Sequence, residues 1–402
     1  MTTRANSSLD RPAPRILLYS HDGFGLGHTR RHIAIAGALV EMAPHASVLL
    51  ASGADDVYRL GLPPRVEALK LPGLRKVGND QYQSRRLAIP TQEIRALRSA
   101  LLATAVKSFR PDVVLVDKHP FGPGGEFSAA LAALKQSGGR AALGLRDILD
   151  DQPAVLSEWN AGGVRDGIEK FYDRVLVYGE RSVFDPVVEY QFPKSVADRT
   201  RFCGYVLNRE NPDCVPAPLD LESRTRPTVI ATTGGGEDGF FLLETFIRAA
   251  SGAPWQGIAV TGPMTPEHEF KTLRGMAAES GVAIYPFLPN LSALFFSVNA
   301  LVSMGGYNTL IEAVATGVPI VCVPRVAPRR EQQLRAQAFE RLGLLHALQP
   351  GQLSVETLRH SIQAALKTFR HQNLDRVNAV LTFDGARQAA GHLLALAGEG
   401  RS

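Results

Sequence analysis

The chain has 402 residues, of which 45% are hydrophobic and 21% are charged, and its formal net charge is +5. These values are typical of a soluble globular protein, and the length favours two domains over one core. No stretch of 18 uninterrupted apolar residues occurs, so we expect no transmembrane helix. The lysines and arginines are scattered without an aromatic-basic stripe, so we expect no nucleic-acid partner.

Targeting signals and cysteine pairs are also not indicated. The first residues, MTTRANSSLDRPAP, are polar and lack the apolar core of a secretory signal. The three cysteines, Cys203, Cys214 and Cys322, show no C-x-x-C spacing, which argues against a disulfide framework or a zinc site. We therefore expect a cytoplasmic protein and leave open peripheral contact with the inner face of the membrane.

The first half of the chain alternates short apolar runs with helical patterns. Strands are expected at 16–19, 47–52, 112–117, 141–145 and 174–179. The clearest helix is 91–109, with an apolar stripe formed by Ile94, Leu97, Leu101, Leu102 and Val106. Near-continuous apolar strands separated by helices predict a parallel sheet that is covered on both faces.

The same alternation restarts after a segment rich in proline and charge, 206–227, which is typical of a linker. The second set of strands is expected at 228–233, 257–262, 282–287, 300–304 and 318–324. The fold class is therefore α/β, with two tandem Rossmann-like domains and an inter-domain cleft. We place the domains at 1–205 and 206–380, and the pattern predicts a terminal helix within 381–402.

Ligands of open α/β sheets bind beyond the carboxyl ends of the strands, so the loops there are the candidate sites. The first is HDGFGLGH, which contains Asp22, Gly25, Gly27 and His28. A dinucleotide fingerprint would need glycine in place of His28 and an acidic residue ending the second strand, and the chain has neither. His28 either projects into the cleft or caps the following helix.

Two further loops follow later strands. DKHPFGPGGEF, 117–127, is bent by three glycines and contains His119, but alone it indicates only a connecting loop. TTGGGEDGFF, 232–241, exposes the backbone N–H groups of Gly234, Gly235 and Gly236 at a predicted helix start, which suits an anion. The acidic residues that follow, Glu237 and Asp238, would repel a phosphate placed too close.

The most informative loop begins at Ser303 and reads SMGGYNTLIEAVATGVPIVCVPR. Gly305 and Gly306 follow a strand and open a short helix, where the N–H groups up to Asn308 and the Thr309 hydroxyl could hold a pyrophosphate. Glu312 lies about 9 Å further along the helix axis, within reach of ribose hydroxyls, although it could also be a solvated residue. After the next strand, Glu331 and Gln332 open another helix and suit sugar hydroxyls.

These motifs resemble the inverting glycosyltransferases of the two-domain glycosyltransferase-B fold. Within that fold, GGYNTLIEAVATGVPIVCVPR followed by EQQLRA is similar to the nucleotide-sugar signature of the peptidoglycan N-acetylglucosaminyltransferase group and of bacterial predicted glycosyltransferases. The G-x-G-H, GPGG and GGG segments occupy the places of that group's glycine loops. The motifs cover about a quarter of the chain, and the order of strands and helices extends the resemblance to nearly all of it. The resemblance also implies that the terminal helix, within 381–402, packs back on the first domain.

The resemblance implies a role for each matching position. His28 is the candidate general base or a group that binds phosphate or acceptor. Asp22, by its place in the same loop, could orient His28, bind acceptor or only support the loop. The diphosphate would lie at Gly305, Gly306 and Thr309, the ribose at Glu312 and the donor sugar at Glu331 and Gln332. The family usually has Asp-Gln where this chain has Glu331-Gln332, and Asn-Ala where it has Arg335-Ala336, so the donor sugar stays open.

The implied reaction moves a sugar from a nucleoside diphosphate, with uridine as the implied base, to the hydroxyl of a small-molecule or lipid-linked acceptor. Histidine suits the proton acceptor, and helix N-termini can stabilise the leaving diphosphate, so no metal ion or other cofactor is expected. The alternatives are a nucleotide-sugar hydrolase on the same scaffold and a non-catalytic nucleotide-sugar-binding protein. The second alternative would have no need of His28.

Overall fold

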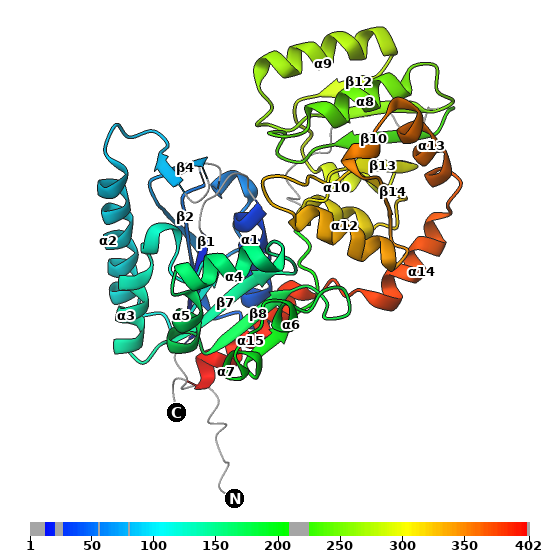
Figure 1. Ribbon diagram of the computed structural model, residues 1–402. Coiled ribbons are helices and arrows are strands. Elements are labelled where there is room, and N and C mark those ends of the chain that lie inside the picture. The colour runs from blue at the N-terminus through cyan, green and yellow to red at the C-terminus, as the bar shows by residue number, and fades with distance from the viewer. Residues whose placement is uncertain (1–12, 21–26, 55–56, 79–80, 209–224, 400–402) are drawn as a thin grey trace, which may run out of the picture.

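The computed structural model describes residues 13–20, 27–54, 57–78, 81–208 and 225–399, which form two lobes, each built on a parallel sheet (Figure 1). Asp22 and Gly25 lie outside the described residues. In the amino-terminal lobe the order of the sheet is β3-β2-β1-β6-β7-β8-β9. Its strands are β1 Arg15–Ser20, β2 Ser47–Ser52, β3 Val66–Lys70, β6 Val113–Asp117, β7 Arg140–Arg146, β8 Arg174–Tyr178 and β9 Thr200–Phe202.

The helices of this lobe cover both faces of its sheet. Successive strand residues point to opposite faces, and in these strands both sets are apolar, so each face needs a covering layer. Ile16 and Leu18 belong to the core beneath α1, whereas Leu17 and Tyr19 belong to the core beneath α2 and α3. An antiparallel hairpin, β4 Leu74–Gly78 and β5 Gln81–Ser84, was not predicted. The helices are α1 Gly27–Met42, α2 Thr91–Phe109, α3 Ser128–Gln136, α4 Gln152–Ala161, α5 Val164–Phe171, α6 Pro186–Glu189 and α7 Lys194–Ala197.

The carboxyl-terminal lobe repeats this design with the order β12-β11-β10-β13-β14-β15. Its strands are β10 Thr228–Thr232, β11 Gln256–Val260, β12 Ala283–Tyr285, β13 Ala300–Ser303, β14 Ile320–Cys322 and β15 His346–Ala347. Its helices, with the two that lead out of it, are α8 Phe240–Ala250, α9 Glu267–Ser280, α10 Leu291–Leu294, α11 Tyr307–Val314, α12 Glu331–Arg341, α13 Val355–Ala365, α14 Arg370–Val380 and α15 Gly385–Glu399. The parallel α/β fold class predicted from the alternating pattern is confirmed.

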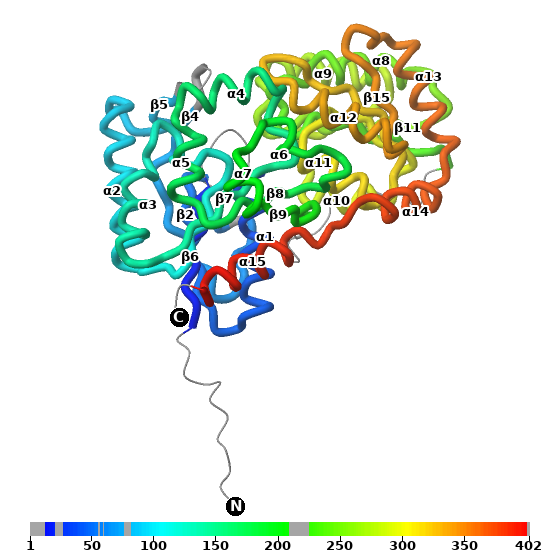
Figure 2. Tube along the Cα trace, turned by 60° about the horizontal axis from the view of Figure 1, so that its bottom comes forward, coloured from blue at the N-terminus to red at the C-terminus, as the bar shows by residue number. Residues whose placement is uncertain are grey.

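Two chain segments cross between the lobes side by side. The Tyr205 N–H donates to the Thr382 carbonyl, and the Gly385 N–H donates to the Tyr205 carbonyl. Figure 2 shows α14 and α15 running from the carboxyl-terminal lobe back to the amino-terminal one. There α15 packs against α1, burying Leu393 and Leu396.

The predicted helix 91–109 is confirmed as α2 at both ends, but its expected stripe is partly wrong. Ile94, Leu102 and Val106 are buried, whereas Leu97 is 42% exposed. Arg98 takes the buried position instead, because its guanidinium bonds both carboxylate oxygens of Glu126 at 2.7 Å. A buried ion pair of this kind cannot be read from hydrophobic periodicity.

Candidate active site at the domain boundary

The first candidate group is a histidine–aspartate pair at the carboxyl end of the amino-terminal sheet. His28 is the second residue of α1, and its Nδ1 lies 2.6 Å from Oδ2 of Asp117, the last residue of β6. Asp117 is fully buried. Burial alone would raise the pKa of this carboxyl, but Arg31 and His28 together hold it well below its usual range. Asp117 is therefore an anion that accepts a hydrogen bond from His28.

The pKa of His28 is lowered to about 4, because burial outweighs the raising effect of Asp117. The imidazole is thus neutral near pH 7. With Nδ1 carrying the proton that it donates to Asp117, Nε2 is the atom that can accept a proton from a substrate. A neutral imidazole has the protonation state that a general base needs, and its lowered pKa makes it a weaker base than an ordinary histidine.

Arg31 completes this cluster from the next turn of α1. Its Nη2 donates to Asp117 at 2.6 Å, and its guanidinium lies over the rings of Tyr178 and Tyr307, 5.1 and 5.5 Å from the centroids. Tyr307 belongs to the carboxyl-terminal lobe, and its hydroxyl donates to the Tyr178 carbonyl at 3.0 Å. The His28 cluster therefore lies directly at the domain boundary.

The predicted diphosphate loop faces His28 across this boundary. A Cβ placed on Gly27 would come within 2.5 Å of the Asn308 side-chain nitrogen, so the start of α1 and the start of α11 are in close approach. Within the carboxyl-terminal lobe, Thr309 Oγ1 lies 3.7 Å from the Cβ position of Gly234. The structure thus brings together three of the glycine loops singled out in the sequence.

Gly305 has a specific steric reason to be glycine, because a Cβ there would lie 2.6 Å from the Gln332 carbonyl. Its own carbonyl accepts a hydrogen bond from Arg335 Nη1 at 2.8 Å. Gly306 has open space where a side chain would be, and it directly precedes α11. Gly305 is therefore packed against Gln332 and Arg335, whereas the space beside Gly306 is open.

Arg335 links the two lobes. It is fully buried, and it bonds both oxygens of the equally buried Asp147, from Nε at 2.8 Å and from Nη2 at 2.7 Å. Asp147 follows β7 in the amino-terminal lobe. Arg335, which stands where the family usually has asparagine, therefore turns toward Asp147 and the Gly305 carbonyl.

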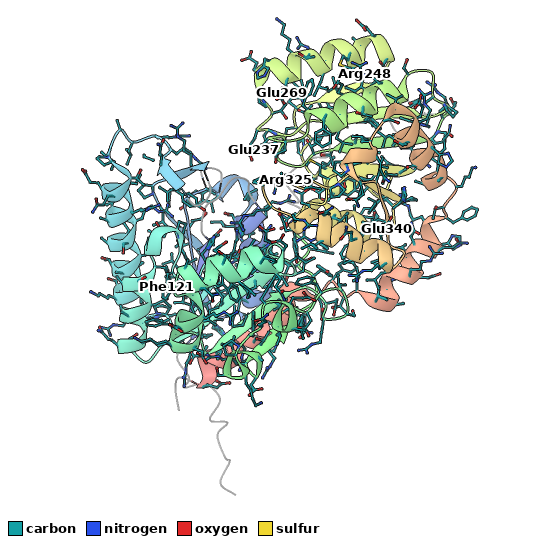
Figure 3. All side chains as sticks on the ribbon, viewed as in Figure 1. Phe121, Glu237, Arg248, Glu269, Arg325 and Glu340 are labelled. Carbon is teal, nitrogen blue, oxygen red and sulfur yellow. The ribbon has the colours of Figure 1, made fainter. Side chains whose placement is uncertain are left out.

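The residues predicted for ribose and sugar are held by other side chains. Glu312 accepts from Asn208 Nδ2 at 2.5 Å and lies 3.4 Å from Arg30. Glu331 Oε1 bonds Arg325 at 2.7 Å, and the Gln332 side-chain oxygen accepts from the Arg325 N–H at 3.2 Å. Arg325 lies on the side of its lobe that faces the other lobe (Figure 3).

The glycine triplet needs a correction. α8 begins at Phe240, so Gly234, Gly235 and Gly236 do not open the helix as predicted. Gly234 and Gly236 have positive φ values of 71° and 97°, and the Gly234 N–H already donates to Thr232 Oγ1 at 3.3 Å. These glycines lie in a turn before α8, and the N-cap of that helix is Gly239.

Ser303 is also placed behind the loop. It is fully buried, and its hydroxyl donates to the Met304 carbonyl at 3.1 Å. This geometry supports the backbone between β13 and α11.

A pocket of about 540 Å³ lies in the amino-terminal lobe, between the Gly122–Gly124 turn and α4. Its lining includes Tyr82, His119 and Glu158. Glu158 also bonds Arg329 of the carboxyl-terminal lobe at 3.4 Å, so the pocket borders the domain boundary.

The structure adds three functional candidates that the sequence reasoning did not select: Arg31, Asp117 and Asp147. Asp117 could have been found, because it is the acidic residue that ends a central strand. Asp147 likewise directly follows a strand, but its contact with Arg335, like that of Arg31 with Asp117, joins residues far apart in the sequence and could not be predicted.

Several glycosyltransferases are similar to this chain in sequence or fold. Residues 244–382 match the family model described as the Glycosyltransferase family 28 C-terminal domain. A UDP-N-acetylglucosamine–N-acetylmuramyl-(pentapeptide) pyrophosphoryl-undecaprenol N-acetylglucosamine transferase of Limosilactobacillus fermentum is 23% identical, over 85% of this chain and 87% of that protein.

Two solved structures share the fold along nearly the whole chain. MurG of Acinetobacter baumannii superposes with a TM-score of 0.61 at 14% identity, over 95% of this chain and 100% of that one. UGT2 of Phytolacca americana, complexed with UDP-2fluoro-glucose and pterostilbene, gives 0.67 at 13% identity, over 97% and 100%.

The two Rossmann-like lobes form the glycosyltransferase-B fold, and the chain is a glycosyltransferase. Within that class it resembles the MurG enzymes. No helix among the described residues is long and apolar enough to cross a membrane.

Proposed function

We propose that this protein is a metal-independent inverting glycosyltransferase that moves a sugar from a UDP-sugar to an acceptor hydroxyl. The observation that carries the proposal is the buried His28–Asp117 pair, 2.6 Å apart, at the point where Gly27 meets Asn308 of the opposite lobe. A base and a phosphate-binding loop are the two parts that this reaction needs on opposite sides of the anomeric carbon.

The acceptor hydroxyl gives its proton to His28 Nε2 while its oxygen forms a bond to the anomeric carbon. The bond from that carbon to the diphosphate oxygen breaks, and its electron pair leaves with the nucleoside diphosphate, so the configuration inverts. Asp117 keeps the ring in one tautomer and stabilises the imidazolium that forms.

The donor's diphosphate is assigned to the segment from Gly305 to Thr309, including Gly306 and Asn308. The N–H groups that open α11 supply partial positive charge to the leaving group without a metal ion. Glu312 is proposed for the ribose, and Glu331 with Gln332 for the sugar. In that case a bound ribose would replace the contacts that Glu312 makes with Arg30 and Asn208.

UDP as the nucleotide is supported by the names of the relatives, which act on UDP-N-acetylglucosamine. The same names make a lipid-linked acceptor the first class to test, and the pocket beside His119 and Glu158 is the proposed acceptor site. This pocket is on the same lobe as the proposed base.

The test measures UDP release from a panel of UDP-sugars, with and without acceptors that carry lipid-linked or free sugar hydroxyls. We expect release to depend on the acceptor and His28→Ala to lower kcat about 10²- to 10⁴-fold. His45→Ala, at an exposed position of the same lobe, is the matched control. Equal UDP release without any acceptor would replace transfer by hydrolysis, and full turnover by folded His28→Ala would remove the base from the proposal.

A further inference from the structure

Arg146 is a cation at the domain boundary that the proposed mechanism does not use. It is the last residue of β7 and pairs in register with Tyr178. Gly144, two residues earlier, pairs with Asp117, so Arg146 lies on the same sheet face as Asp117 and one pleat beyond it. The next residue, Asp147, bonds Arg335 of the other lobe. Arg146 therefore lies between the base cluster and the phosphate loop.

The neighbouring arginines each have a carboxylate. Arg31 bonds Asp117 at 2.6 Å, Arg335 bonds Asp147 at 2.7 Å and Arg325 bonds Glu331 at 2.7 Å. The Arg146 side chain, by contrast, makes no hydrogen bond or ion pair with any residue in the part of the chain that the structure describes, and its Nε is buried. A buried donor without a partner costs free energy, so this position is not explained by stability.

The positive charges around Arg146 also favour an anionic ligand at this position. Burial, together with the positive charges of Arg31 and Arg335, lowers the pKa of Arg146, while Glu331 opposes that effect. The guanidinium still stays protonated at any physiological pH. Glu331 has a buried Oε2 without a partner, and no ion pair joins it to Arg146. A buried donor and a buried acceptor are thus both left unpaired beside the phosphate loop.

We infer that Arg146 binds a phosphate oxygen of a substrate at the domain boundary. Beside it, a hydroxyl of the same substrate would donate a hydrogen bond to Oε2 of Glu331. A guanidinium matches the geometry of phosphate and can donate two parallel hydrogen bonds to it. The phosphate has two sources, the donor's diphosphate or a phosphate on the acceptor. The donor assignment rests on the proposed function, whereas the anion site itself does not.

The test compares wild type with Arg146→Gln and Arg146→Lys, using inorganic pyrophosphate, UDP and uridine as calorimetric ligands. We expect Arg146→Gln to weaken pyrophosphate and UDP binding about ten- to hundredfold and to leave uridine unchanged. Lysine should retain part of the affinity. Arg341→Gln, on the exposed end of α12, is the matched control. Ligand-free Arg146→Gln should have a Tm equal to or above that of wild type, because it loses a cation that has no partner.

The source is decided by titrating pyrophosphate in saturating UDP. If UDP blocks the Arg146-dependent binding, the phosphate is the donor's, and if binding persists, it is the acceptor's. The inference is overturned if Arg146→Gln binds pyrophosphate and UDP as wild type does, or if it only lowers the Tm. If pyrophosphate binds through Arg146 but no nucleoside diphosphate binds, the proposed function fails while the anion site stands.

Discussion

Two buried arginine–aspartate pairs flank the ring of Tyr307, and they differ in which lobes they join. The guanidinium groups of Arg31 and Arg335 each lie 5.5 Å from the ring centroid. Arg31 pairs with Asp117 inside one lobe, whereas Arg335 pairs with Asp147 across the boundary.

The difference separates two tasks that an active site between domains must perform. The Asp117 pair belongs to the lobe of His28, so the base is assembled whatever the position of the other lobe. The Asp147 pair connects that lobe to the Gly305 carbonyl through Arg335, so it fixes where the phosphate loop lies relative to the base. Breaking one pair should therefore affect the chemistry, and breaking the other should affect the coupling of the lobes.

The largest expected effect is that of Asp117→Asn. An asparagine can present its NH₂ group to Nδ1 and so favour the wrong tautomer of His28, and it leaves Arg31 without its counter-ion. We expect kcat to fall about 10²- to 10⁴-fold and the free energy of unfolding to fall by about 3–5 kcal/mol. Steady-state kinetics and denaturant unfolding measure the two effects, and near-normal kcat in the folded variant would contradict the orienting role.

Asp147→Ala should act mainly on stability. It leaves Arg335 buried without a counter-ion, at a cost of about 3–5 kcal/mol. The double variant Asp147→Ala/Arg335→Met should recover much of that loss, because it removes both charges together. Both variants should raise KM for the donor more than they lower kcat, since the base remains assembled. A larger effect on kcat than on KM would contradict this separation of tasks and show that the two pairs act as one functional unit.

The pH dependence of activity sharpens the same comparison. The pKa of His28 is lowered to about 4, so the neutral base persists well below pH 6.5 and kcat/KM should fall only as the pH approaches about 4. At pH 5.5 activity should be near its neutral value, whereas a histidine with the ordinary pKa of 6.5 would be about tenfold less active. Rates measured from pH 4 to 8 distinguish these cases.

Stability should show the same window with the matching sign. His28 and the fully buried His32 both have pKa values lowered to about 4, so between about 4 and 6.5 the unfolded chain binds protons that the folded chain does not. Stability therefore decreases as the pH falls through that range. His32→Leu should show a weaker decrease than wild type in denaturant unfolding at pH 7 and pH 5, and an unchanged decrease would contradict the shift at His32.

The sequence predicted the parts of the site that follow a local rule. Gly305 and Gly306 were found because glycines after a buried strand open a helix, and His28 because it breaks a glycine fingerprint. Asp22 was proposed to orient His28 because it is near in sequence, whereas Asp117, 89 residues away, holds that position among the described residues. Parallel register brings β1 beside β6 and supplies this partner, and no local pattern encodes it. In the sequence Arg335 stands out only as a departure from a motif, since its partner Asp147 lies in the other lobe.

The smallest expected effect concerns Glu312, which is proposed for the ribose and lies 3.4 Å from the one-third-exposed side chain of Arg30. Solvent at the partly exposed Arg30 screens this ion pair, which contributes about 1 kcal/mol or less, so Arg30→Ala should change stability little. It should leave UDP affinity unchanged or raise it a few fold, because Glu312 no longer exchanges one partner for another on binding. Glu312→Gln should instead weaken UDP about tenfold, since it loses a charged acceptor for the ribose hydroxyls. Calorimetry on both variants tests the pair, and a loss of UDP affinity in Arg30→Ala equal to that in Glu312→Gln would make the ion pair part of the nucleotide site.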